Sequence, residues 1–330
     1  MKISILITSY NLVDYIDDAI SSVICQEFPC DWELLIGDDG STDGTLEHIN
    51  NWISKFPDNI QLITENRDGE EGKTGSRAAR NRARLLEKAS GDYINYLDGD
   101  DCWLGTVKLK EQLEMLENPR YKDCSCCAHN IEAFYIPKNA CRIMVDETIS
   151  TRTYSAKEYW PKQYFHTNTI LFRKECKEMM LDSLYRDHLN DNFITYILLQ
   201  YGKILYLNKV WARYNLTGEG LWTGKGPVYG RFRNLTLYDL ERHIEPKLWL
   251  ESFERHLGDF KIILKDYSPE KYKIVEPIVG NLPQDVFRVT RGLALKPDAS
   301  LREKLARLVI ILEYWLLRLC LKVHTIIKNI

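Results

Sequence analysis

Short apolar runs alternate with amphipathic segments along the first hundred residues of the chain. Four runs have the length and composition of buried strands: residues 3–7, 32–36, 60–64 and 93–97. The segments between them repeat apolar residues at helical spacing: 12–25, 46–53 and 75–89. This alternation predicts an α/β domain whose sheet is mixed, mostly parallel and Rossmann-like, with helices on its faces.

The pattern changes after Lys108. The expected helices cover 107–117 and a segment that begins after Asn190 and ends at Gly202, and the expected strands are 124–136, 167–173, 204–207 and 210–214. A glycine-rich loop at 218–226 and a mostly helical remainder follow. We therefore expect one α/β domain with two halves, 1–105 and 106–226, and a helical C-terminal extension at 227–330.

Composition is that of an ordinary globular protein. Apolar residues make up 45% and charged residues 28% of the 330 residues, which is enough for a sizeable core. The net charge of −3 gives no basic excess that would favour nucleic acid, so we expect no nucleic-acid partner.

The nine cysteines follow no zinc-ligand spacing. We interpret them as reduced, buried thiols of a cytoplasmic protein, with a metal or redox role as the alternative. The sequence shows no signal-peptide pattern and no uncharged apolar stretch of the roughly 18 residues that a membrane span needs. We therefore expect neither a signal peptide nor a spanning helix.

Three of the four predicted strands end in polar or acidic residues. They are followed by residues 8–11, 38–39 and 98–101. In parallel sheets ligands gather beyond the carboxyl ends of the strands. We therefore expect these three segments to face a common ligand.

The segment 98–101 has the chemistry of a divalent-cation site. Asp98, Asp100 and Asp101 crowd like charges, which is unfavourable unless a cation or solvent compensates. Oxygen ligands suit Mg²⁺ or Mn²⁺, and such a metal can bridge a protein carboxylate to a diphosphate. A solvated acidic turn is the alternative, as an Asx-type turn is for residues 38–41.

Four motifs, taken in order, resemble those of family 2 glycosyltransferases. They are ILITSYN at 5–11, DDGSTD at 38–43, ARN at 79–81 and GDYINYLDGDD at 91–101. The resemblance implies the glycosyltransferase-A fold. It also implies an inverting transfer from a nucleotide-diphosphate sugar, commonly UDP-linked, to a hydroxyl of a saccharide or lipid-linked acceptor, as in surface polysaccharide synthesis. In these terms 1–105 binds the donor and 106–226 the acceptor.

The resemblance also assigns roles in binding the nucleotide. Thr8 and Tyr10 line the base pocket, Asp39 accepts a hydrogen bond from the base, and Gly75 allows close approach of the nucleotide. Asp98 faces the ribose or a metal-bound water. Arg77 and Arg80 are weaker candidates for phosphate contact.

Catalysis is assigned to the acidic turn and to a later aspartate. Asp100 is the implied direct ligand of Mn²⁺ or Mg²⁺, with Asp98 as a second metal residue and Asp101 in support. Asp191 falls where the family keeps its catalytic base. A helix N-cap explains an aspartate at that position equally simply.

Three residues depart from the family pattern. Asn190 stands where a glutamate is usual, and Asn215 and Thr217 replace an arginine and a histidine. These departures leave open a second function, that of a catalytically decayed partner protein that binds a nucleotide sugar. Residues 166–169 either line the acceptor side or begin a structural strand. A nucleotidyltransferase is disfavoured because no glycine-rich phosphate loop follows the first strand.

The C-terminal segment 301–328 combines a broad apolar face with a basic stripe. The stripe consists of Lys304, Arg307, Arg318 and Lys322. A helix of this kind either lies on a membrane surface, which makes the protein peripheral on the cytoplasmic face, or packs on protein, in the same chain or in a homodimer. The sequence leaves both interpretations open.

Overall fold

The computed structural model describes residues 1–65, 77–159, 165–183, 185–217 and 265. Gly75 and the predicted segments at 218–226 and 301–328 lie outside these residues. The division of the chain into regions at 105 and 226 stays a prediction.

The strands of the described residues form one sheet. They are β1 (Lys2–Ser9), β2 (Asp31–Asp38), β3 (Ile60–Thr64), β4 (Tyr93–Asp98), β5 (Cys102–Trp103), β6 (Cys124–Tyr135), β7 (Ala140–Ile143), β8 (Arg152–Tyr154), β9 (Leu171–Arg173) and β10 (Lys203–Leu216). The predicted strands at 3–7, 32–36, 60–64 and 93–97 correspond to the first four of these.

The helices between these strands are mostly short. They are α1 (Ile16–Ile24), α2 (Thr45–Lys55), α3 (Arg77–Lys88), α4 (Lys108–Glu117), α5 (Ala156–Tyr159), α6 (Lys177–Met180) and α7 (Asp191–Tyr201). Several 3₁₀ turns supplement them, including η3 (Thr167–Thr169). Among the helices of the described residues, none is both long and apolar enough to cross a bilayer.

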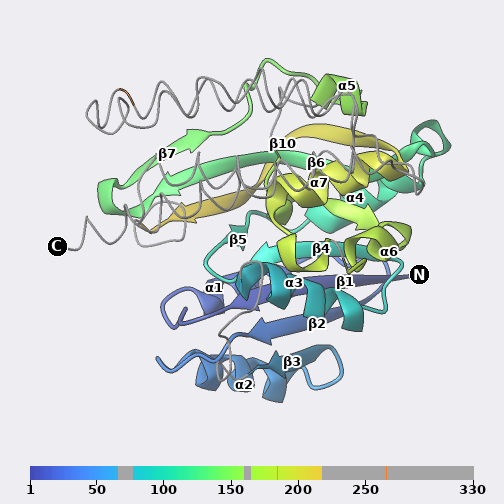
Figure 1. Cartoon of the computed structure of the whole chain (residues 1–330). Coiled ribbons are helices and arrows are strands. Elements are labelled where there is room, and N and C mark those ends of the chain that lie inside the picture. Colours follow the sequence, from blue (N-terminus) through green and yellow to red (C-terminus); the bar gives the residue numbers. More distant parts are fainter. Residues whose placement is uncertain (66–76, 160–164, 184, 218–264, 266–330) are drawn as a thin grey trace. The chain divides into compact units, whose positions relative to one another are not determined.

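The sheet is mixed, as the sequence predicts. Parallel pairing joins β3, β2, β1 and β4, which lie side by side in that order (Figure 1). Beyond β4 the pairing becomes antiparallel through β9 to β6, and β10 then runs parallel to β6. The short strands β5, β7 and β8 add further antiparallel pairs.

Helices cover both faces of the parallel part of the sheet. Successive strand residues point to opposite faces, so these strands contact helices on both sides. On one face Ile5 and Ile7 of β1 are buried in a cluster with Ile20 of α1. On the other face the Asn81 amide of α3 donates to the Gly37 carbonyl of β2 at 2.6 Å. A Cβ at Gly37 would lie 2.1 Å from the Asn81 side-chain oxygen, so glycine permits this close approach.

Two predictions of strand boundaries are wrong. The strands expected at 204–207 and 210–214 form the single strand β10, because register shifts on either side of Val210 let both parts pair with β6. Residues 167–169 form a turn, and only the last part of the strand expected at 167–173 is extended.

The turn that follows β4 presses against the end of β1. The Gly99 N–H donates to the Thr8 carbonyl at 2.9 Å, and the Asp101 N–H donates to the Asp98 carbonyl at 2.9 Å. A Cβ at Gly99 would lie 2.8 Å from the Thr8 carbonyl oxygen, closer than a carbon atom can approach without displacing the backbone. Glycine between the aspartates therefore fixes the position of this turn.

We expect Gly99→Ala to destabilise the fold by about 1–3 kcal/mol, because the added methyl group meets the main-chain oxygen of Thr8, which cannot move without displacing β1. Urea unfolding measures this free energy. Glu114→Ala, on the exposed side of α4, is the control and should change it by less than about 0.5 kcal/mol. Equal midpoints for wild type and Gly99→Ala would contradict the close contact.

Candidate functional site

The polar ends of β1, β2 and β4 meet at one edge of the sheet. The parallel register places Ser9 beside Asp38 and Thr8 beside Asp98. The Thr8 hydroxyl donates to Asp98 Oδ1 at 2.7 Å, and the Asp39 N–H donates to the Ser9 carbonyl at 2.9 Å. Strand pairing alone thus brings Thr8, Asp39 and Asp98 to the same edge.

The two aspartates that end β2 have different partners. Asp38 is buried and accepts hydrogen bonds from the N–H groups of Gly40 and Ser41, at 3.0 and 2.8 Å, which is the Asx-type turn considered above. Asp39 forms an ion pair with Arg77 of α3, with Nε to Oδ2 at 2.8 Å. Arg77, predicted as a phosphate contact, thus lies beside the aspartate predicted to bind the base.

Tyr10, the predicted stacking residue, is exposed directly after β1. Its side chain has 41% of its surface accessible, which is unusual for a large aromatic residue. The next residue, Asn11, has φ 50° and accepts a hydrogen bond from the Thr42 N–H at 2.9 Å. The backbone after β1 is therefore anchored to the loop after β2 while the Tyr10 ring remains accessible.

A buried arginine, Arg82 of α3, joins two of the predicted site residues. One terminal nitrogen donates to both oxygens of Asp98, at 2.9 and 2.7 Å. The other donates to Asp191 Oδ1 at 3.2 Å and to the Leu189 carbonyl at 3.3 Å. Burial disfavours this charge, but the carboxylates of Asp98 and Asp191 outweigh burial and raise the pKa of Arg82.

The sequence reasoning missed Arg82. A signal was available, because Arg82 lies on the same side of α3 as the buried residues Ala79, Ala83 and Leu86. An arginine on the apolar side of a helix requires a partner for its charge. The acidic residues at the strand ends do not by themselves point to a cation on a helix.

Asp191 is the first residue of α7, and Asn190 before it is the N-cap. The Asn190 side chain accepts a hydrogen bond from the Phe193 N–H at 3.0 Å. The alternative that Asp191 is the helix cap is therefore wrong. Its carboxylate instead accepts from the Thr167 hydroxyl at 3.0 Å through Oδ1, and Oδ2 lies 3.5 Å from His166 Nε2.

Asp101 is fully buried beneath the acidic turn. Its two oxygens accept from the Asn168 amide at 3.0 Å and from the Asn215 N–H at 2.9 Å. Burial, followed by repulsion from Asp100 and Asp98, raises the pKa of Asp101 well above its usual value. The Asn215 amide also donates to the Asp100 carbonyl at 2.8 Å, so this departure from the family pattern has a structural role.

Asp100 occupies an unfavourable position for a negative charge. Burial, followed by repulsion from Asp98, raises its pKa from 3.8 to about 6. The carboxylates of the turn therefore exceed the positive charge that Arg82 supplies. A divalent cation would relieve this excess.

The donor atoms at the turn fit a divalent metal. Asp98, Asp101 and His166 each offer a ligand atom, and these atoms lie within 4.8 Å of one another. Carboxylate oxygens suit Mg²⁺ and Mn²⁺, and an imidazole nitrogen without a proton would favour Mn²⁺. Asp100, the predicted direct ligand, lies in the same turn but outside this group of three. The metal roles of Asp98 and Asp100 therefore stay predictions.

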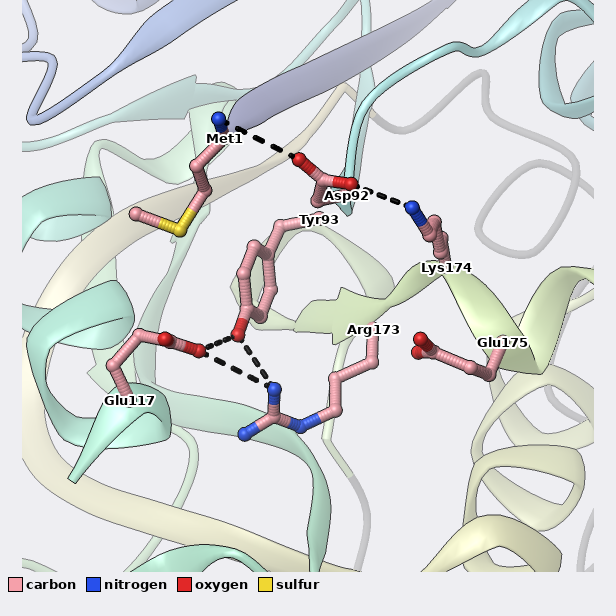
Figure 2. Close-up of a pocket in the computed structure, with 7 residues that line it drawn as sticks. All are labelled: Met1, Asp92, Tyr93, Glu117, Arg173, Lys174 and Glu175. Carbon is pink, nitrogen blue, oxygen red and sulfur yellow. Dashed lines mark hydrogen bonds and ion pairs between the residues drawn. The ribbon is translucent and has the colours of Figure 1, made fainter. Parts of the chain in front are cut away.

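A separate pocket lies where β1 and β4 begin, at the other end of these strands from the acidic turn (Figure 2). It has a volume of about 310 Å³ and is lined by Met1, Asp92, Tyr93, Glu117, Arg173, Lys174 and Glu175. Ion pairs join Lys174 to Asp92 at 2.6 Å and Arg173 to Glu117 at 3.4 Å. Because these charges neutralise one another, we do not regard this pocket as the candidate site.

Comparison with known proteins identifies the family. The family model described as glycosyl transferase family 2 matches residues 4–179. The chain is 39% identical over 115 residues to WfgD of Escherichia coli, named a UDP-Glc:alpha-D-GlcNAc-diphosphoundecaprenol beta-1,3-glucosyltransferase. That match covers 34% of this chain and 40% of WfgD. The chain thus spans about two fifths of the length of the curated relatives that it matches.

Solved structures share the fold. TarS of S. aureus, in complex with UDP-GlcNAc, superposes with a TM-score of 0.60 at 16% identity, over 88% of this chain and 81% of that one. The mannosyltransferase PcManGT of Pyrobaculum calidifontis, in complex with GDP-Man and Mn²⁺, gives a TM-score of 0.50 at 16% identity, over 88% and 81%. The fold is thus the predicted glycosyltransferase-A fold, and this chain belongs to glycosyl transferase family 2.

Proposed function

We propose that this chain is a metal-dependent, inverting glycosyltransferase that moves a sugar from a UDP-linked donor to a hydroxyl of a saccharide or lipid-linked acceptor. One observation carries the proposal. Asp98 at the end of β4 and Asp191 at the start of α7 bind the same guanidinium of Arg82. The Arg82 side chain therefore holds together Asp98, which is assigned to donor binding, and Asp191, which is assigned to take the proton of the acceptor hydroxyl.

The donor assignment rests on the edge formed by β1, β2 and β4. Tyr10 offers an exposed ring for stacking on a base, Thr8 lies at the end of the same strand, and Asp39 follows the neighbouring strand β2. TarS was solved with UDP-GlcNAc, and the name of WfgD specifies UDP-glucose, which supports a UDP-linked donor. Gly75 keeps its predicted role near the nucleotide, although it lies outside the described residues.

The proposed reaction is a single displacement. The acceptor oxygen forms a bond to the anomeric carbon while the bond from that carbon to the diphosphate breaks, and its electron pair leaves with the diphosphate. Asp191 takes the proton of the acceptor hydroxyl, because a hydroxyl is a poor nucleophile at neutral pH. Arg82 and Thr167 hold the carboxylate through Oδ1. Because its orientation is already fixed, less conformational entropy is lost on reaching the transition state.

We propose that Asp100 and Asp98 hold a Mn²⁺ or Mg²⁺ ion with the donor, and that Asp101 supports the turn from below. Such a cation, when bound, would stabilise the negative charge on the departing diphosphate. The Mn²⁺ and GDP-Man bound to PcManGT support this assignment, as does the raised pKa of Asp100. The Mn²⁺ affinity of an Asp100→Asn variant distinguishes Asp100 from Asp101 as the direct ligand.

The acceptor and the cellular setting extend the proposal. The name of WfgD specifies a diphosphoundecaprenol-linked acceptor, which supports a lipid-linked saccharide as acceptor here. We extend the proposal to polysaccharide synthesis at the cytoplasmic face of a membrane. The segment 301–328 would bring the enzyme to that surface or form a homodimer, and it lies outside the described residues. The decayed-partner alternative loses support because Asn190 and Asn215 have structural roles.

A nucleotide-sugar screen tests the donor. We expect UDP-glucose or UDP-GlcNAc with Mn²⁺ to raise the melting temperature more than the same compound with EDTA, since a ligand of the folded state stabilises it by about 2.7 kcal/mol at 100 times its Kd. GDP-mannose serves as the comparison. Equal melting temperatures with and without every nucleotide sugar would contradict donor binding.

Substitution of Asp191 tests the base. We expect Asp191→Asn to lower kcat for UDP release by about 10²-fold to 10⁴-fold, because an amide cannot accept the acceptor's proton. The shift in melting temperature on donor binding should persist. Asp123→Asn, on the surface beside Lys203, is the matched control and should keep the wild-type rate. A fully active Asp191→Asn variant would remove the assignment.

The pH dependence of stability tests the crowding at Asp100. A carboxyl whose pKa rises on folding from 3.8 to about 6 stabilises the fold fully below pH 3.8, and this stabilisation is lost as the pH rises through 6. With EDTA present, the melting temperature of Asp100→Asn should therefore equal that of wild type at pH 4 and exceed it by about 2–5 °C at pH 7.5.

Mn²⁺ with UDP should reverse this order at pH 7.5 by stabilising wild type more than the variant. Asp58→Asn, an exposed turn residue, is the control and should show the same difference from wild type at both pH values. An Asp100→Asn variant that binds Mn²⁺ as tightly as wild type would exclude Asp100 as a metal ligand and leave Asp101.

A further inference from the structure

His166 lies between the two parts of the candidate site. Its ring nitrogen Nε2 is 3.5 Å from Asp191 Oδ2, and it is also one of the three groups whose ligand atoms could hold a cation with Asp98 and Asp101. These positions give the imidazole two possible roles, as a metal ligand or as a partner of the proposed base. The hydrogen bonds of the ring distinguish them.

The Asn168 N–H donates to His166 Nδ1 at 3.4 Å, so Nδ1 bears a lone pair. A neutral imidazole carries one N–H group and one bare nitrogen. The tautomer that this contact favours carries its proton on Nε2, the nitrogen that faces Asp191. An Nε2–H group can donate to the Asp191 carboxylate, whereas binding a cation through Nε2 would require the proton on Nδ1, where it would face the Asn168 N–H.

The surroundings fix the ring in this orientation. His166 is 4% exposed, and its ring centroid lies 4.6 Å from that of Tyr214 on β10. It also stands at the N-cap of the turn η3, whose first residue, Thr167, donates to the other oxygen of Asp191. This short stretch, residues 166–169, thus places Thr167 against one oxygen of the Asp191 carboxylate and His166 near the other.

We propose that His166 is a positioning residue for Asp191, acting as an Nε2–H donor to Oδ2, and not a ligand of the metal. The inference rests on the proposed function of Asp191 as the base. In family members a glutamate usually precedes the base, and here Asn190 is instead occupied as the helix cap. His166, Thr167 and Arg82 provide the contacts that orient the carboxylate in this chain.

The test compares His166→Leu with His166→Gln, because the glutamine amide can reach as far as Nε2 and retains an N–H donor. Three quantities are measured for each variant: kcat and KM for UDP release from UDP-glucose or UDP-GlcNAc, whichever wild type turns over, the Mn²⁺ affinity in the presence of UDP, and the melting temperature. His129→Leu is the matched control, since His129 is also buried against an aromatic ring, that of Trp211.

We expect His166→Leu to lower kcat by about 10-fold to 100-fold, with KM for the donor and the Mn²⁺ affinity within about threefold of wild type. His166→Gln should recover most of the lost rate, and His129→Leu should keep kcat within about twofold whatever its melting temperature.

Three results would overturn the proposal. A tenfold or greater loss of Mn²⁺ affinity in His166→Leu would make His166 a metal ligand. An unchanged kcat in His166→Leu would show that His166 has no role in the reaction. An equal loss of kcat in the leucine and glutamine variants would show that His166 contributes only by packing. Asp191→Asn is measured in parallel, because its full activity would refute the base itself and so separate failure of the proposed function from failure of this inference.

Discussion

The candidate site depends on one buried cation. Arg82 on α3 is 7% exposed and holds Asp98 from β4 and Asp191 from α7 at the same time. Removing one partner of a buried ion pair typically costs about 3–5 kcal/mol, because the remaining charge is then buried without compensation. The end of the parallel sheet, the helix that covers it and the start of α7 are therefore held together by electrostatics as well as by packing.

The same arrangement leaves an excess of negative charge at the acidic turn. Arg82 pairs its one positive charge with both Asp98 and Asp191, whereas Asp100 and Asp101 have raised pKa values because they are buried beside other carboxylates. Such crowding costs stability in the absence of a cation, and proteins tolerate this cost at functional sites. Hydrogen bonds hold the turn in place despite this cost, since the Gly99 N–H and the Asn215 side chain bind it to β1 and β10.

Two of the three residues that depart from the family pattern, Asn190 and Asn215, form hydrogen bonds that support the candidate site. Asn190 caps α7 and so sets the position at which Asp191 begins the helix. Asn215 donates to the Asp100 carbonyl through its side chain and to Asp101 through its main chain. These substitutions therefore replace charged groups by hydrogen bonds that hold the acidic turn and the helix in place, rather than leaving the positions without a function.

The sequence by itself determined the strands, the order of the motifs and the gathering of Thr8, Asp39 and Asp98 at one edge, because apolar runs specify buried strands and parallel pairing aligns their ends. Only the tertiary structure decided what surrounds Asp191. Its contacts come from α3 and from the turn η3, at sequence separations of 109 and 24 residues. No local pattern encodes contacts between such distant segments, so the partners of a buried charge emerge only when the chain is packed.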